Sequence, residues 1–211
     1  MTSVDLSQYK SPAPLLPHTE WEKKLSGGFS RVLSMIEDRQ RRITEEGFPI
    51  ITVECLDKLV QHIGKKTVFE VGAGTGYLAR LLHDRGVNIT AIDSQNGSYT
   101  RQQWWENDNV HYFPIEKLDV TTLQELPGDI VLMSWPCYES DFAYEVARRL
   151  RPGQQLIYQG ESKGGCCAND RFFDYMSGSR RFARNDLDTL YEVHVCDFGV
   201  YDSWEAWLTI R

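Results

Sequence analysis

The sequence is organised around residues 67–82, which read TVFEVGAGTGYLARLL. A short β-rich apolar run leads to three glycines at alternate positions, Gly72, Gly74 and Gly76, and an amphipathic helical pattern follows at once. This order predicts a strand, a tight glycine turn and the first turn of a helix. A glycine turn lets backbone approach a ligand where a Cβ would clash, and a helix start presents N–H groups to an anion. The stretch therefore predicts a ligand-binding turn within an α/β fold.

Two acidic residues accompany this unit. Glu70 lies two residues before the first glycine, and Asp93 ends a second apolar run, residues 87–93. In doubly wound α/β sheets, an acid at the end of the second strand binds ribose hydroxyls, because a carboxylate accepts hydrogen bonds from both hydroxyls of a diol. The glycine turn and the second acid together predict a nucleoside-containing ligand.

The spacing G-x-G-x-G, with an acid two residues ahead, resembles motif I of the class I S-adenosylmethionine (SAM)-dependent methyltransferases, E/D-x-G-x-G-x-G. The dinucleotide fingerprint places its third glycine one residue later. The resemblance implies SAM as the cofactor, with Glu70 near the methionine amino group and Asp93 on the ribose. Asp119 would meet the adenine amino group, and a helix N-cap for residues 121–126 is the alternative role. The cofactor contacts implied are Glu70, Gly72, Ala73, Gly74, Gly76, Asp93, Ser94, Asp119 and Ser134.

Residues 134–138 (SWPCY) follow the apolar run DIVLM and occupy the place of motif IV in these enzymes. In nitrogen-directed methyltransferases this motif reads Asp/Asn-Pro-Pro-Tyr/Phe. Here Trp135 fills the polar position, and only Pro136 and Tyr138 match. This departure argues against an adenine or glutamine N-methyltransferase. The S-W-P-x-Y form, with a later G-E-x-x-G-G-C loop, resembles a group of methyltransferase-like proteins without an assigned substrate.

Tyr138 and Glu161 are the predicted catalytic residues. Tyr138 follows the fourth strand and Glu161 follows the fifth, residues 155–159, so both are expected at the carboxyl edge of the sheet, where such folds bind ligands. Either side chain would orient or deprotonate the methyl acceptor. The alternative role for Glu161 is capping, or an ion pair with Arg171 or Lys163.

The rest of the chain alternates strand and helix patterns, which requires a parallel sheet with right-handed crossovers. We predict one α/β domain with the Rossmann-like class I methyltransferase fold, a seven-stranded, mostly parallel sheet with an antiparallel C-terminal strand. Residues 1–47 are expected to form an N-terminal arm and lid helices, and residues 48–211 the SAM-binding domain. The remaining strands are expected at residues 110–114, 190–196 and 204–210, and a helix carrying Trp104 and Trp105 within residues 94–108.

Charge and cysteine usage limit the partners. A net charge of −7 over 211 residues argues against broad capture of nucleic acid. The five cysteines are irregularly spaced with no C-x-x-C pair, so neither a disulfide framework nor a metal site is expected. No apolar run is long enough to cross a bilayer. These features predict a cytoplasmic protein, and they leave its oligomeric state open.

The function that these features favour is SAM-dependent methyl transfer to a small molecule or metabolite. One alternative is a SAM-binding, catalytically silent partner subunit, which the altered motif IV favours. Another is an RNA or protein methyltransferase, supported by the cluster Arg180, Arg181 and Arg184. The glycine spacing disfavours an NAD-dependent oxidoreductase.

Overall fold

The computed structural model of the chain describes residues 4–26, 32–95, 111–185 and 187–211. Its centre is a seven-stranded sheet with the order β3-β2-β1-β4-β5-β7-β6. The first five strands are parallel, and β7 runs antiparallel to both of its neighbours. The strands are β1 (Val68–Val71), β2 (Ile89–Asp93), β3 (Glu116–Lys117), β4 (Ile130–Ser134), β5 (Gln155–Glu161), β6 (Phe182–Asn185) and β7 (Asp202–Thr209). The predicted sheet is confirmed.

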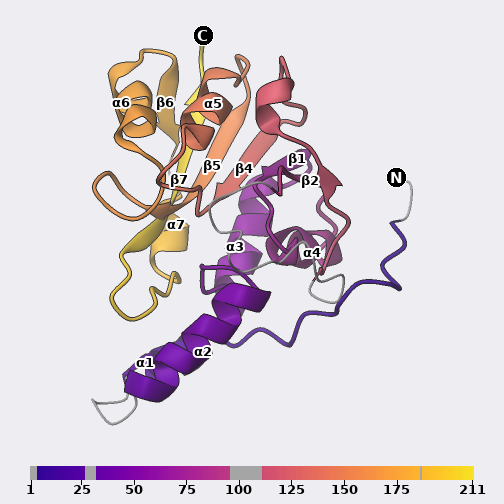
Figure 1. Ribbon diagram of the computed structural model, residues 1–211, viewed down its shortest axis with the longest axis vertical. Helices are drawn as coiled ribbons and strands as arrows, with labels where there is room; N and C mark the ends of the chain where they lie inside the picture. Colours follow the sequence, from indigo (N-terminus) through magenta and orange to yellow (C-terminus); the bar gives the residue numbers. More distant parts are fainter. Residues whose placement is uncertain (1–3, 27–31, 96–110, 186) are drawn as a thin grey trace.

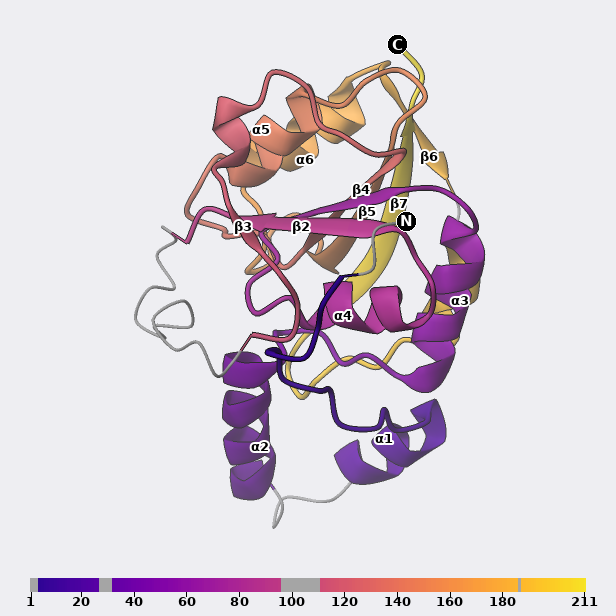
Figure 2. The same ribbon diagram turned by 90° about the vertical axis from the view of Figure 1, so that its right-hand side faces the viewer.

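Helices cover both faces of the sheet, as Figure 2 shows. One face carries α3 (Val53–Ile63), α4 (Tyr77–Asp84) and α7 (Asp188–Tyr191), and the other carries the 3₁₀ helix η5 (Val120–Thr122), α5 (Phe142–Arg148) and α6 (Asp170–Gly178). Strand residues alternate between the two resulting cores. Val68 belongs to the α3/α4 core, whereas Phe69 and Val71 belong to the α5/α6 core. Because the central strands are buried on both faces, they read as continuous apolar runs.

The N-terminal region runs outside the sheet. Helices α1 (His18–Leu25) and α2 (Val32–Glu45) project from one end of the molecule (Figure 1). The segment before them is tied to the body, because Lys10 N donates to His111 O at 2.9 Å and Val53 N donates to Leu16 O at 3.3 Å. The expected arm is therefore packed along the domain.

The third strand begins two residues after the end of the predicted one. The described part of the predicted strand, residues 111–114, is not β structure, and β3 is a two-residue strand that pairs with the end of β2. The apolar side chains responsible for the prediction, Tyr112 and Phe113, are both only 3% exposed and pack on α4. Their apolar character reflects burial against a helix and not strand pairing.

The predicted strand at residues 190–196 is also wrong. Leu190 lies in α7. In the described segment between α7 and β7, the β pairing is a single antiparallel bridge, between Val195 and Ile50. The sixth strand is instead β6, which contains Arg184 of the basic cluster. The two edges of β7 are occupied by β5 and β6, so no edge of β7 is left for residues 190–196.

The structure also bears on the predicted absence of a membrane span and on the predicted helix before β3. No helix in the described part of the chain is long and apolar enough to cross a membrane. The predicted helix with Trp104 and Trp105 lies outside the described residues.

Candidate functional site

A cleft of about 460 Å³ opens at the carboxyl ends of β1, β2 and β4. This volume is within the usual range for small-molecule sites, and the place is where doubly wound sheets bind ligands. All of the predicted cofactor residues except Gly76 line it. They are Glu70, Gly72, Ala73, Gly74, Asp93, Ser94, Asp119 and Ser134. The sheet thus brings together residues from four separate stretches of the sequence.

The glycine turn supplies the floor of the cleft. All three glycines have positive φ, at 69° for Gly72, 57° for Gly74 and 73° for Gly76, a region that L side chains rarely adopt. A Cβ on Gly76 would lie 2.9 Å from the Cβ of Phe113, so this glycine is required for packing behind the turn. A Cβ on Gly72 would lie 3.1 Å from the ring of Phe142 at the cleft. The turn therefore serves both ligand access and close packing.

Asp93 holds the glycine turn in place. Its Oδ2 accepts from Gly74 N at 2.9 Å, and its Oδ1 accepts from Gln95 N at 2.7 Å. Burial raises the pKa of this carboxyl, and the two backbone hydrogen bonds oppose that rise. Each carboxylate oxygen can accept a second hydrogen bond. Asp93 is thus oriented in the cleft with acceptor capacity left for a diol.

Glu70 is buried at the base of the cleft, 2% exposed. Among the described residues, no hydrogen-bond donor reaches its Oε2. Burial, with a contribution from the charge of Asp93, raises the pKa of Glu70 to about 8. A buried acceptor without a donor costs about 1–3 kcal/mol. An ammonium group entering the cleft would remove that cost.

The other predicted cofactor residues have structural partners. Asp119 Oδ1 accepts from both N and Oγ1 of Thr121 at 2.8 Å, so the capping alternative describes its contacts, at the start of η5. Ser134 Oγ donates to Gln159 Oε1 at 3.0 Å. Both residues still line the cleft.

Neither predicted catalytic residue, Tyr138 or Glu161, lines the cleft. The Glu161 side chain is turned toward the loops that follow β5 and precede β7, where Oε2 accepts from Cys166 N at 2.6 Å and Oε1 accepts from Tyr201 N at 3.1 Å. The residue is 9% exposed, and neither Arg171 nor Lys163 is its partner. Tyr138 lies outside the lining and is 51% exposed. Position at the end of a strand placed these residues near the site but did not determine side-chain direction.

An aromatic wall was missed by sequence reasoning. The rings of Phe48 and Trp135 stack with centroids 4.7 Å apart and planes at 12°, and both line the cleft. Trp135 has a φ of 47°, which is unusual for a bulky residue, and its Nε1 donates to Asp202 Oδ2 at 3.3 Å. The signal in the sequence was the tryptophan at the polar position of motif IV.

Glu46 was also missed. It lies just after α2, lines the cleft, and has a pKa raised by burial, opposed by the charges of Arg42 and Arg41. The other cleft acids near the wall are ion-paired, Asp141 with Arg171 and Glu145 with Arg148 and Arg149. Within the described part of the chain, the Glu46 carboxylate has neither a hydrogen bond nor an ion pair. The break at residues 47–49 was the available sign that its helix ends at the cleft.

The sequence matches no protein-family model and no curated protein sequence. Among solved structures, the chain is similar to a protein from Klebsiella pneumoniae assigned as an O-methyltransferase, with 15% identity over 92% of this chain and 96% of that chain and a TM-score of 0.52. It is also similar to the 1,6-didemethyltoxoflavin-N1-methyltransferase of Burkholderia thailandensis, solved with that substrate and S-adenosylhomocysteine, with 17% identity over 95% and 94% of the two chains and a TM-score of 0.49. At 15% identity the likeness to the first of these shows the fold alone, and together with the strand order it confirms the predicted Rossmann-like class I methyltransferase fold.

Proposed function

We propose that the chain is a SAM-dependent methyltransferase that acts on a small molecule. The observation that carries this proposal is the carboxylate of Glu70, which is buried at the base of the cleft with an oxygen that no described donor reaches. An α-ammonium group supplies that donor, and a ribose diol supplies donors for Asp93. Both groups belong to one molecule in SAM.

The residues present fit this cofactor. Glu70 would hold the amino group and Asp93 the ribose, while the positive-φ glycines Gly72 and Gly74 let the ligand approach the backbone. Asp119, Ser94 and Ser134 line the same cleft and stay proposed contacts. When bound, SAM supplies a methyl group on a sulfonium sulfur.

The chain's own contribution would be to orient the acceptor and exclude water. Transfer to a positioned nucleophile needs little covalent help from the protein, since proximity and alignment lower the barrier substantially. Phe48 and Trp135 form an apolar wall on which a flat or apolar acceptor can pack. Glu46, with its elevated pKa, is the acid available to accept a proton from the acceptor. We propose that Glu46 deprotonates the methyl acceptor, the role first predicted for Glu161. Because Glu46 belongs to residues 1–47 and lines the cleft, we also propose that this region acts as a lid.

The size and walls of the cleft favour a small acceptor over RNA or protein. The alternative of a catalytically silent subunit differs in one respect, because it needs the cofactor contacts but no acceptor group. Glu46 without a described partner favours the active enzyme.

Calorimetry with SAM, S-adenosylhomocysteine and NAD tests the proposal. We expect binding of the first two, no heat with NAD, and at least a tenfold loss of affinity in Asp93→Ala and Gly74→Val. Gly86→Val is the matched control for backbone strain, because Gly86 has a φ of 83° and nothing within 4 Å of an added Cβ. Asp84→Ala is the control for charge. Unchanged affinity in both cleft variants, with folding intact by circular dichroism, would reject the assignment, as would binding of NAD alone.

A further inference from the structure

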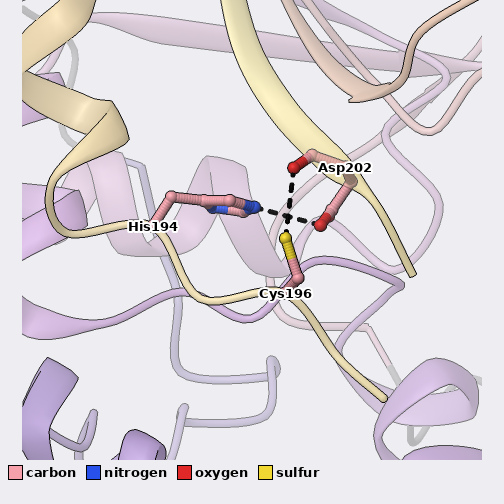
Figure 3. A group of neighbouring side chains, drawn as sticks. All are labelled: His194, Cys196 and Asp202. Carbon is pink, nitrogen blue, oxygen red and sulfur yellow. Dashed lines mark hydrogen bonds and ion pairs between the residues drawn. The ribbon is translucent and has the colours of Figure 1, made fainter. Parts of the chain in front are cut away.

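Three metal-ligating side chains converge behind the aromatic wall of the cleft. His194 and Cys196 lie on the segment between α7 and β7, and Asp202 is the first residue of β7 (Figure 3). The His194 Nε2 and Asp202 Oδ1 atoms are 3.0 Å apart, and the three ligand atoms all lie within 4.8 Å of one another. The side chains of His194 and Asp202 are 7% and 2% exposed, whereas Cys196 is exposed.

The surroundings of Asp202 orient one carboxylate oxygen toward the other two residues. Its Oδ2 accepts from Gln159 Nε2 at 2.5 Å and from Trp135 Nε1 at 3.3 Å. Its Oδ1 is left facing His194. Carboxylate ligands of metal ions are typically hydrogen-bonded through their second oxygen in this way, which fixes the geometry of the first.

We propose that His194, Cys196 and Asp202 bind a divalent ion of the zinc type, through Nε2, the thiolate and Oδ1. Imidazole, thiolate and carboxylate are the three ligand types that zinc uses in proteins. No fourth described His, Cys, Asp or Glu joins the cluster, so water would complete a tetrahedral site. The inference goes beyond the proposed function and does not depend on it.

The geometry needs only a small adjustment. Tetrahedral zinc with ligands at about 2.0–2.3 Å separates its ligand atoms by roughly 3.3–3.6 Å. The buried pair His194 and Asp202 is already close to that spacing, and the exposed Cys196 side chain can rotate to reach it. Cys196 Sγ now donates to the backbone oxygen of Asp202 at 3.3 Å, and on binding the thiol proton would leave to solvent.

An ion there would stabilise the wall of the cleft. Val195, between two of the ligands, bridges to Ile50, which adjoins the cleft-lining residue Pro49. Asp202 also holds the indole of Trp135. One ion would therefore join the segment 194–196, β7 and the aromatic wall, which indicates a structural role.

The test uses the full-length protein, stripped with a chelator and then titrated with Zn²⁺ or Co²⁺ alone. We expect one bound zinc ion per chain, measured by elemental mass spectrometry. With Co²⁺ we expect a thiolate-to-cobalt charge-transfer band in the near ultraviolet. Cys196→Ser should abolish the band and weaken zinc binding at least tenfold. Cys166→Ser is the matched control, an exposed cysteine outside the cluster, and should behave as the native chain does.

His194→Gln is a second variant that keeps a donor for Asp202, and it should lose the metal while keeping the fold by circular dichroism. Binding of less than a tenth of an equivalent would overturn the proposal and leave a hydrogen-bonded His–Asp pair with a neighbouring thiol. Equal zinc affinity in the native chain and Cys196→Ser, or a cobalt spectrum without the thiolate band, would overturn it as well.

Discussion

Glu70 is a carboxyl group that the fold buries without a described donor for one of its oxygens, and this makes stability depend on pH. Its pKa is about 8 in the folded chain, above the ordinary value of 4.5. The folded state therefore binds the proton more tightly than the unfolded state, and the stability contributed by the protonated group is lost as pH rises from about 4.5 through about 8. Each pKa unit is worth about 1.4 kcal/mol.

We predict that Glu70→Gln removes this dependence. Urea unfolding at about pH 5.5 and about pH 8.5 should show the free energy of unfolding of the variant rising by several kcal/mol relative to the native chain at the higher pH. Glu125→Gln, at an exposed position before β4, should follow the native chain at both pH values. Parallel behaviour of Glu70→Gln and the native chain would show that Glu70 does not carry the buried proton.

Glu161, the last residue of β5, holds two loops through its carboxylate, whereas the carboxylate of Glu70 faces the cleft. Because its two oxygens accept from Cys166 N and Tyr201 N, we predict that Glu161→Gln destabilises the fold by about 1–3 kcal/mol while SAM affinity stays the same. The amide cannot accept at both positions. Chemical denaturation and calorimetry separate the two effects, with Glu139→Gln as an exposed control. If the Glu161→Gln variant keeps the native denaturation midpoint but transfers methyl groups more slowly, Glu161 takes part in catalysis.

At the scale of elements, helix α3 joins the body of the sheet to the segment that carries the proposed metal ligands. Thr52 is fully buried at its N-cap, where Oγ1 accepts from Cys55 N at 3.0 Å and donates to Val193 O at 3.3 Å. Thr52 therefore caps α3 and holds the segment after α7 at the same time.

We predict that Thr52→Ala lowers the free energy of unfolding by about 1–2 kcal/mol, because both a helix N–H and the Val193 carbonyl lose their partner. Thr52→Ser retains the hydroxyl and should recover most of the loss. Denaturant titration of both variants is sufficient. Equal stability of the alanine and serine variants would mean that the hydroxyl contributes nothing.

The elements that the sequence predicted well are those buried by the sheet itself. Almost every residue of β1, β2, β4 and β5 is buried, and each strand is followed by a turn or helix signal. β3 and β6 are edge strands of two and four residues with mostly polar or half-buried side chains, so neither alternation nor a long apolar run marks them. The apolar run at Tyr112 and Phe113 predicts a strand because burial against a helix and burial in a sheet give the same pattern over so few residues.

In the cleft, too, the features that follow from the order of the strands could be predicted, and those that depend on distant contacts could not. That Glu70 and Asp93 line one cleft could be predicted because backbone position determines it, and the ends of β1 and β2 necessarily meet at one edge. The opposite wall of the cleft depends on side-chain direction and on contacts distant in sequence, such as Phe48 with Trp135 and Asp202 with His194. Those pairings leave no local pattern. For this reason the sequence predicts Glu161 at the cleft and does not predict that Glu46 lines it.

At the scale of the whole molecule, the arginine cluster that suggested nucleic acid lies at or beside β6, the edge strand farthest from β3. Arg181 is engaged by the protein, since it donates to Leu150 O at 2.6 Å, to Tyr175 Oη at 2.8 Å and to Arg211 O at 3.0 Å. Arg184 lies 3.8 Å from Glu205, and neither residue lines the cleft. Arg181 is thus committed to the fold, whereas Arg180 and Arg184 are exposed, and none of the three arginines lines the cleft.

A chain of net charge −7 with only two exposed arginines in this cluster should bind RNA poorly, because non-specific affinity arises from counterions released by several phosphate contacts. We predict a dissociation constant weaker than about 100 μM for a labelled single-stranded RNA at physiological salt, measured by fluorescence anisotropy. The double variant Arg180→Ala/Arg184→Ala, which spares the structural Arg181, should change this no more than Lys65→Ala/Lys66→Ala at an exposed turn after α3. Micromolar affinity that falls steeply with salt, and that the arginine variant alone abolishes, would move the acceptor from a small molecule to RNA. Such a result would also require the RNA to pass from β6 across β7 and β5 to reach the cleft beside β4, so protection of those strands on RNA binding, measured by hydrogen exchange, would have to accompany it.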